Sequence, residues 1–159
     1  MPFIRRTQKK DLPKVIELFV RMFKWSPMRA KAFMGYWLRI QPDLAFLAGE
    51  KKEIIGAIFV GVKPLWDGNH LFDGEIFVSP AAQRKGIGSA LVNKMLNIAI
   101  KKYHVTSWEA FTFRTKGHPL GWHKKLGFVE NKKWIMISGR AKKIQQKSRK
   151  YFSVAEFEI

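Results

Sequence analysis

The feature that constrains this chain most is a strand-like run that ends in a glycine loop and continues as an amphipathic helix. Residues 70–78 form the run, Gly86 and Gly88 lie in the loop, and apolar residues then recur at helical spacing. Such a junction points free backbone N–H groups and the positive end of a helix dipole at one place, where a phosphate or pyrophosphate binds well. Arg84 and Lys85 add positive charge beside it.

Two familiar nucleotide-binding loops do not fit this sequence. A Rossmann fingerprint needs a third small residue where Leu91 stands, and no convincing acidic residue for a ribose follows. A P-loop would end in Gly-Lys-Ser/Thr, which this loop lacks. A glycine turn without a ligand is the remaining alternative, and the neighbouring Arg84 and Lys85 disfavour it.

The other periodicities predict a single mixed α/β (α+β) domain over residues 1–159, without a linker or an internal repeat. About six or seven strands are expected, at 3–7, 43–50, 53–62, 70–78, 105–113, 133–138 and 151–159, and about four helices, at 11–23, 27–38, 87–102 and 120–126. Asp11 is the expected N-cap of the first helix, with Pro13 in its first turn. The basic residues 139–150 are expected to form a loop, although their sequence also permits a helical turn.

Composition excludes several classes of protein. A hydrophobic fraction of 47%, with 13 Phe and 6 Trp, is too high for a disordered tail. No apolar run reaches the roughly 20 residues that span a bilayer, and residues 1–6 lack the apolar stretch of a secretory signal, so we expect a cytoplasmic protein outside the membrane. The chain has no Cys, and its four His lack zinc-ligand spacing, so no metal is expected.

The charge is strongly positive. Thirty Lys and Arg against twelve Asp and Glu give a net charge of +18, which attracts polyanions at low salt. The densest basic run lies at residues 140–150. This charge either keeps the surface solvated or contributes to contact with RNA or another polyanion. A nucleic-acid- or ribosome-associated binding module is therefore the alternative function.

Two motifs carry a family resemblance. Gln83-x-x-Gly86-x-Gly88 after a strand resembles the Gln/Arg-x-x-Gly-x-Gly/Ala motif of the GCN5-related N-acetyltransferase (GNAT) family. The run from Trp122 to Phe128, WHKKLGF, resembles the second signature of that family, an aromatic pair followed by Glu-Lys-Leu-Gly-Phe. The order of elements also fits, so the resemblance covers nearly the whole chain and is weakest after Gly139. It implies transfer of an acetyl group from acetyl coenzyme A to an amine, and it suggests a homodimer.

The resemblance also implies how the coenzyme binds. The sheet is expected to splay between the strand at 70–78 and the next strand, where the amide chain of the pantetheine arm pairs like an added strand. Backbone amides of the loop then bind the pyrophosphate. The coenzyme-binding residues implied are Phe77, Val78, Gln83, Arg84, Lys85, Gly86, Ile87, Gly88 and Ser89.

His123 stands where many members of the family have a Tyr that is suggested to protonate the departing thiolate. A His can donate a proton, so the resemblance makes His123 a candidate catalytic acid, with packing as the alternative. Lys116 and Pro119 also depart from the family pattern, at positions where many members have Asn and Ala.

Glu75 is the leading candidate for the base that deprotonates the acceptor amine, because it lies three residues before Val78 on the strand that leads to the thioester. Asp73 is an alternative on the same side by strand alternation, and Glu109 is a carboxylate within a largely uncharged strand. For each of these carboxylates, a salt bridge without a catalytic role is the alternative. A water chain is a further candidate for the base. The expected acceptor is a primary amine, either on a small molecule or at a protein N-terminus or lysine.

Overall fold

The structure is a computed structural model that describes residues 1–114 and 119–148. It divides into two compact units, Met1–Trp122 and His123–Ile159, each of which is described by itself. In chain order the elements are β1 (Phe3–Arg6), η1 (Lys9–Asp11), α1 (Leu12–Phe23), α2 (Pro27–Ile40), η2 (Pro42–Leu44), β2 (Phe46–Glu50), β3 (Glu53–Leu65), β4 (Gly68–Val78), η3 (Pro80–Ala82), α3 (Ile87–Tyr103), β5 (Val105–Glu109), α4 (Leu120–Lys125) and α5 (Ala141–Ser148).

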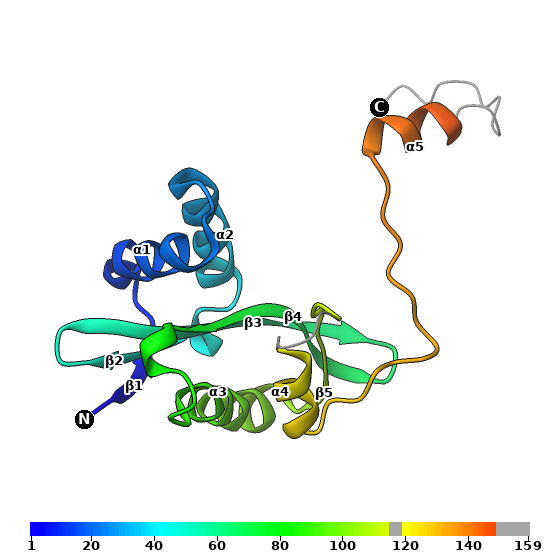
Figure 1. The fold of residues 1–159 in the computed structure, drawn as a ribbon. Helices are drawn as coiled ribbons and strands as arrows, with labels where there is room; N and C mark the ends of the chain where they lie inside the picture. Colours follow the sequence, from blue (N-terminus) through cyan, green and yellow to red (C-terminus); the bar gives the residue numbers. More distant parts are fainter. Residues whose placement is uncertain (115–118, 149–159) are drawn as a thin grey trace. The chain divides into compact units, whose positions relative to one another are not determined.

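The strands of the first unit form one sheet in the order β1-β2-β3-β4-β5 (Figure 1). All neighbours are antiparallel except β4 and β5, which are parallel. The described residues therefore contain five strands and five α-helices, and the expected count of six or seven strands and four helices was wrong. Residues 133–138 do not pair with another described strand, and the strand expected at 151–159 lies outside the described residues. A β-propensity pattern forms a strand only where a neighbour completes its hydrogen bonds.

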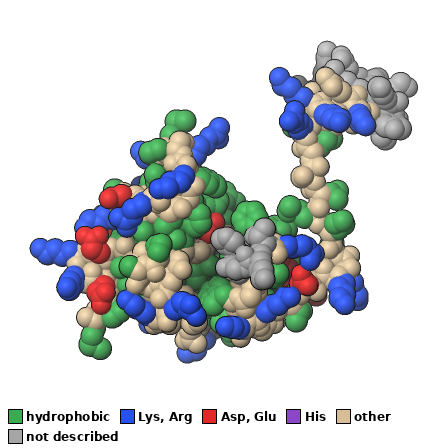
Figure 2. Space-filling view, viewed as in Figure 1, with side chains coloured by type: hydrophobic (Ala, Val, Ile, Leu, Met, Phe, Trp, Pro, Cys, Tyr) green, Lys and Arg blue, Asp and Glu red, His purple; other side chains and the backbone are tan. Residues whose placement is uncertain are grey.

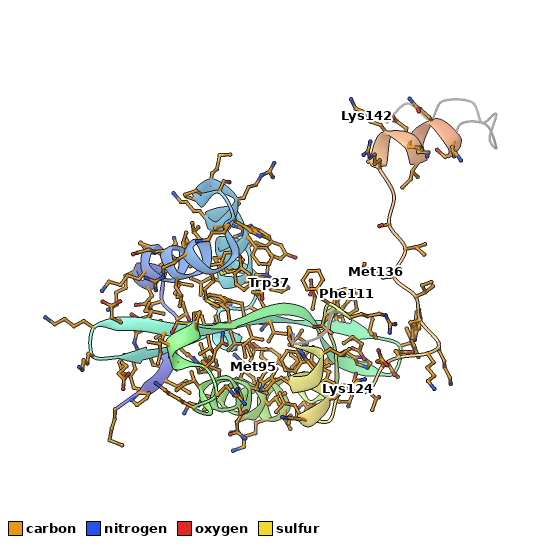
Figure 3. The ribbon with its side chains drawn as sticks, in the orientation of Figure 1. Trp37, Met95, Phe111, Lys124, Met136 and Lys142 are labelled. Atoms are coloured by element: carbon orange, nitrogen blue, oxygen red, sulfur yellow. The ribbon has the colours of Figure 1, made fainter. Side chains whose placement is uncertain are left out.

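The sheet separates two layers of the core. Phe59 and Phe77 pack with α1 and α2 on one face, and Ile58 and Leu71 pack with α3 on the other. Figure 3 shows this division: Trp37 of α2 and Met95 of α3 lie on opposite sides of the sheet. Period-two alternation along β3 sends neighbouring side chains into different layers, so this strand is buried on both faces.

Asp11 stands at the N-cap position of α1, as expected, but its side chain does not cap that helix. Its carboxylate instead accepts the Gln8 N–H at 2.8 Å and two hydrogen bonds from Arg5, each at 2.7 Å. The short 3-10 turn η1 precedes α1 directly, so the cap serves this turn and ties β1 to it.

A β-bulge interrupts β4. Val60 of β3 faces two residues, Asp73 and Gly74, both with positive φ (59° and 112°). A Cβ added at Gly74 would lie 2.5 Å from the Phe59 carbonyl oxygen, so the bulge requires glycine there. Because of the extra residue, simple alternation does not relate the side chain of Asp73 to that of Glu75, which was the basis for placing both on one side.

The strands β4 and β5 pair only from Asn69 to Phe72, opposite Val105 to Glu109. Beyond this point β4 continues to Val78, and its β5-facing edge has no strand partner among the described residues. This is the splay that the family resemblance implied. We call the point after Phe72 and Glu109, where pairing stops, the strand fork.

Helix α4 ends at Lys125, and two backbone hydrogen bonds close the turn that follows at Gly127. The Gly127 N–H donates to the Lys124 carbonyl and the Phe128 N–H donates to the His123 carbonyl, both at 3.1 Å, and Gly127 has φ 98°. The Leu-Gly-Phe sequence is thus a helix stop that needs glycine. Further along, α5 replaces the loop expected within residues 139–150, which is the helical alternative that the sequence permitted.

Within residues 1–114 and 119–148, no helix has both the length and the apolar character that crossing a bilayer requires.

Candidate functional site

The glycine loop presents free backbone donors at the start of α3. Gly86 is the N-cap residue in a left-handed conformation (φ 79°), with no side chain capping it, and the Ala90 N–H makes the first backbone bond of the helix, to the Gly86 carbonyl at 2.9 Å. The N–H groups of Ile87, Gly88 and Ser89 precede that bond and have no acceptor within the helix. Three donors and the positive end of a 17-residue helix therefore meet at one place.

The side chains of the loop divide into two roles. Gln83 is exposed, and its Nε2 donates to the Val78 carbonyl at 2.9 Å and so ties the loop to the end of β4. Arg84, with φ 61°, and Lys85 are exposed. Gln83 thus ties the loop to β4, and the two cations that follow give the loop its positive charge.

The two sequence motifs meet within the first unit. A Cβ added at Gly88 would lie 3.3 Å from Cζ2 of Trp122, so the indole packs directly against this glycine. Trp122 also packs against the apolar layer around α3. The second glycine of the loop therefore has a packing reason that is separate from ligand binding.

Aromatic side chains anchor the end of β4. The ring of Phe77 is 3% exposed and lies 5.3 Å from Phe19 and 6.2 Å from Phe23, centroid to centroid. Val78 packs into the α3 layer. Figure 2 shows hydrophobic side chains gathered in the middle of the viewed face, with Lys and Arg around them. The core thus holds the side chains at the end of β4, and the β5-facing edge of this part of the strand has no strand partner among the described residues.

Glu75 lies between these anchors and the bulge. It pairs with Phe59 on β3, on the sheet face that carries α1 and α2. Burial, and next the negative charge of Asp73, raise the pKa of Glu75 from 4.5 to about 7, against a hydrogen bond from the Ile76 N–H. Burial also raises the pKa of Asp73. A carboxylate with a pKa near neutrality can accept and return protons under physiological conditions.

Glu109 is part of a different group of side chains. Its carboxylate lies 2.9 Å from Nδ1 of His70 and accepts a hydrogen bond from Ser107 Oγ at 2.7 Å. The other ring nitrogen of His70 lies 3.0 Å from Asp67 Oδ1. Sequence reasoning singled out Glu109 and missed its partners, although Ser107 and Glu109 are two residues apart and so share one face of a strand. Among the described residues, no group of His, Asp or Glu is arranged to hold a metal ion.

His123 begins the second unit. Its ring meets that of Phe128 edge to face, with centroids 5.1 Å apart, and its carbonyl accepts the bond that closes α4. The motif therefore fixes His123 and Phe128 relative to each other. Pro119 lies just before α4, and Lys116 lies outside the described residues.

Comparison with known families agrees with this geometry. The family model of the acetyltransferase (GNAT) family matches residues 12–128, which include strands β2 to β5, the glycine loop and the Leu-Gly-Phe stop. The chain belongs to this family. No curated protein sequence matches this GNAT chain closely enough to count as a relative.

Several solved structures are similar to this GNAT chain. The aminoglycoside N-acetyltransferase AAC(6')-Iy in complex with CoA has a TM-score of 0.72 at 21% identity, covering 89% of this chain and 96% of its own. A transcriptional regulator from Bacillus halodurans C-125 has a TM-score of 0.70 at 17% identity, covering 87% and 100%. A predicted acetyltransferase from Clostridium acetobutylicum, solved with acetyl-CoA, has a TM-score of 0.67 at 17% identity, covering 87% and 96%. At these identities the likeness establishes the fold.

Proposed function

We propose that this protein is an N-acetyltransferase that uses acetyl coenzyme A and transfers the acetyl group to a primary amine by direct attack on the thioester. The observation that carries the proposal is the unpaired edge of β4, which ends at the free N–H groups of α3. An amide chain attached to a pyrophosphate needs both features side by side: strand-like partners for its amides and an anion site beyond them. Membership of the GNAT family supports the same chemistry.

Each part of the coenzyme has a matching group on this chain. The backbone of Phe77 and Val78 pairs with the pantetheine arm at the unpaired edge. The pyrophosphate binds the amides of the loop from Gln83 to Ser89, beside Arg84 and Lys85. AAC(6')-Iy was solved in complex with CoA, and the Clostridium protein with acetyl-CoA, which agrees with acetyl coenzyme A as the donor here.

Glu75 serves as the base. An alkylammonium acceptor must lose a proton before its nitrogen can attack the thioester carbonyl, and a carboxylate with a pKa of about 7 can take that proton at neutral pH. Asp73 contributes through its charge, since it raises the pKa of Glu75. Glu109 is less suited to be the base, because it already accepts a hydrogen bond from Ser107 and lies against His70.

His123 donates a proton to the sulfur as the C–S bond breaks, which gives free coenzyme A as the leaving group. The argument for this role is its position in the second motif, in place of the Tyr of many family members. Its contact with Phe128 holds the ring in one orientation, which a proton donor needs.

The acceptor is a primary amine on a small molecule, a protein N-terminus or a lysine. AAC(6')-Iy is an aminoglycoside N-acetyltransferase, but a likeness at 21% identity does not transfer that substrate to this chain. A net charge of +18 repels polycationic acceptors, which argues against aminoglycosides unless acidic residues gather near the acceptor. Neither the family nor the similar structures support the nucleic-acid-binding alternative.

The placement of the coenzyme is tested by a matched pair of variants, Gly86→Asp and Gly86→Asn. A Cβ at this position meets nothing within 4 Å, and both residues tolerate positive φ, so the pair differs mainly by one negative charge. If the pyrophosphate binds this loop, the Asp variant should bind acetyl coenzyme A at least about tenfold more weakly than the Asn variant, because a new carboxylate faces the phosphates. Titration calorimetry measures the Kd of each variant for acetyl coenzyme A.

Equal affinities of the Asp and Asn variants would show that the pyrophosphate does not bind at the loop. Absence of any acetyl coenzyme A binding by the unmodified protein would contradict the proposed function itself.

A further inference from the structure

Four polar side chains form a cluster beside the strand fork. We call them the His70 cluster: His70 on β4, Ser107 and Glu109 on β5, and Asp67 in the turn that precedes β4. Leu71 and Trp108, which follow His70 and Ser107 in the sequence, belong to the α3 layer. By strand alternation the cluster therefore lies on the opposite face of the sheet.

His70 is the centre of this cluster. Its side chain is 8% exposed, and it contacts three partners: Asp67 at 3.0 Å through Nε2, and Ser107 at 2.7 Å and Glu109 at 2.9 Å through Nδ1. Ser107 and Glu109 are also bonded to each other. His70 is buried whereas Asp67 and Glu109 are about half exposed, so the cluster depends on the His70 ring that its partners share. Because the contacts share this ring, losing one of them weakens the others.

A contact on the other face of the sheet fixes the fork from the opposite side. Trp108 Nε1 donates to the backbone carbonyl of Asp73, in the bulge, at 3.2 Å. The last three residues of β5 are thus each tied by a side chain to β4 or its turn, just where pairing with β4 ends. In the described residues that follow Glu109, the chain makes no further strand pairs with β4, although Phe111 contacts the ring of Phe72.

We propose that His70 is a positioning residue for coenzyme binding: by tying Ser107 and Glu109 to β4 and to the preceding turn, it fixes where β5 leaves β4. The position of the fork sets how much of the β4 edge stays open for the pantetheine arm. This inference rests on the proposed function, because it concerns the same unpaired edge. His70 acts through β5 and does not touch the reacting groups.

Replacing His70 with Phe keeps a ring in the strand and removes all three contacts that the two ring nitrogens make. We expect the Kd and KM for acetyl coenzyme A to rise about tenfold, less than the roughly 100-fold that a displacement of 1 Å at the chemistry can cost. The kcat at saturating coenzyme should change by less than about twofold, because only binding is affected. Combining His70→Phe with Glu109→Gln should weaken coenzyme binding little more than either change alone, since both break one cluster.

Ser107→Ala removes a single hydroxyl from the cluster and provides a milder variant in case His70→Phe does not fold. Ser107→Ala should also raise the Kd for acetyl coenzyme A, by a smaller factor than His70→Phe. The matched control is Asp11→Asn, which breaks a bidentate ion pair with Arg5 at the β1 edge of the sheet, far along the strand order from the fork. It should lower the Tm and leave the Kd for acetyl coenzyme A unchanged.

The Kd by titration calorimetry, the KM and kcat by steady-state kinetics and the Tm by thermal unfolding are measured for all of these variants and for the unmodified protein. A raised Kd with a nearly constant kcat, and additivity failing between His70→Phe and Glu109→Gln, support the positioning role. A fall in Tm with an unchanged Kd, as for Asp11→Asn, would overturn it and leave the cluster with a structural role only. Binding by the unmodified protein separates either result from a failure of the proposed function.

Discussion

Replacing Glu75 with Gln should stabilise the protein at alkaline pH and slow the reaction. The pKa of Glu75 is raised to about 7 in the folded protein, whereas an unfolded glutamate titrates near 4.5. Between these values the folded state holds a proton that the unfolded state has released, so the free energy of unfolding falls as the pH rises from 4.5 through 7. The difference of about 2.5 pKa units lowers the free energy of unfolding by about 3 kcal/mol in total. Gln cannot ionise and does not incur this loss.

Urea unfolding of the two proteins between pH 4 and pH 8.5 measures the difference. Near pH 4 the two free energies of unfolding should be similar, and above pH 8 the Gln variant should be more stable by up to about 3 kcal/mol. Glu17→Gln, which removes the same charge from an exposed position on α1, is the matched control and should give no comparable rise. A pH-independent difference between Glu75→Gln and the unmodified protein would refute the assignment of a raised pKa to burial of Glu75.

The same variant tests the catalytic role of Glu75. In the unmodified enzyme kcat/KM should increase with pH with a midpoint at about 7, as the base loses its proton. In Glu75→Gln this increase of kcat/KM with pH should disappear. The rate at pH 8 should fall by about 100-fold, which is the lower end for loss of a proton-transfer group. An unchanged rate and pH profile would move the role of base to Asp73, Glu109 or a water chain. A stabilised but slow variant would show that this buried carboxylate is kept for function at a cost in stability.

The remaining predictions concern the second motif and the bulge. His123→Phe should lower kcat by about 100-fold and leave the Kd for acetyl coenzyme A nearly unchanged, as measured by steady-state kinetics and calorimetry; an unchanged kcat would return His123 to a packing role. Gly74→Ala should destabilise the protein by roughly 2 kcal/mol or more in urea unfolding, because the new Cβ would lie 2.5 Å from the Phe59 carbonyl at a φ of 112°, and a loss below about 0.5 kcal/mol would mean that the bulge adapts.

Local sequence patterns predicted much of the site. The loop after β4, its two glycines and the free N–H groups at the start of α3 follow from residues within a few positions of each other, and the structure places them as expected. The Gly127 stop was predictable for the same reason. The isolated Gly74 within a strand pattern was an available signal for the bulge, since such a glycine often marks one. The bulge at Gly74 breaks the strand alternation on which the placement of Asp73 beside Glu75 depended.

The sequence by itself determined the class of fold and the elements as far as α4, because helix and strand periods and glycine turns are set by neighbours along the chain. It also determined the family, through two motifs that each occupy a continuous stretch. The tertiary structure decided what depends on distant partners: that Glu109 joins His70, 39 residues away, and that residues 133–138 pair with no described strand. It likewise decided that burial and Asp73 raise the pKa of Glu75, because burial and electric fields depend on the whole packed environment of a group.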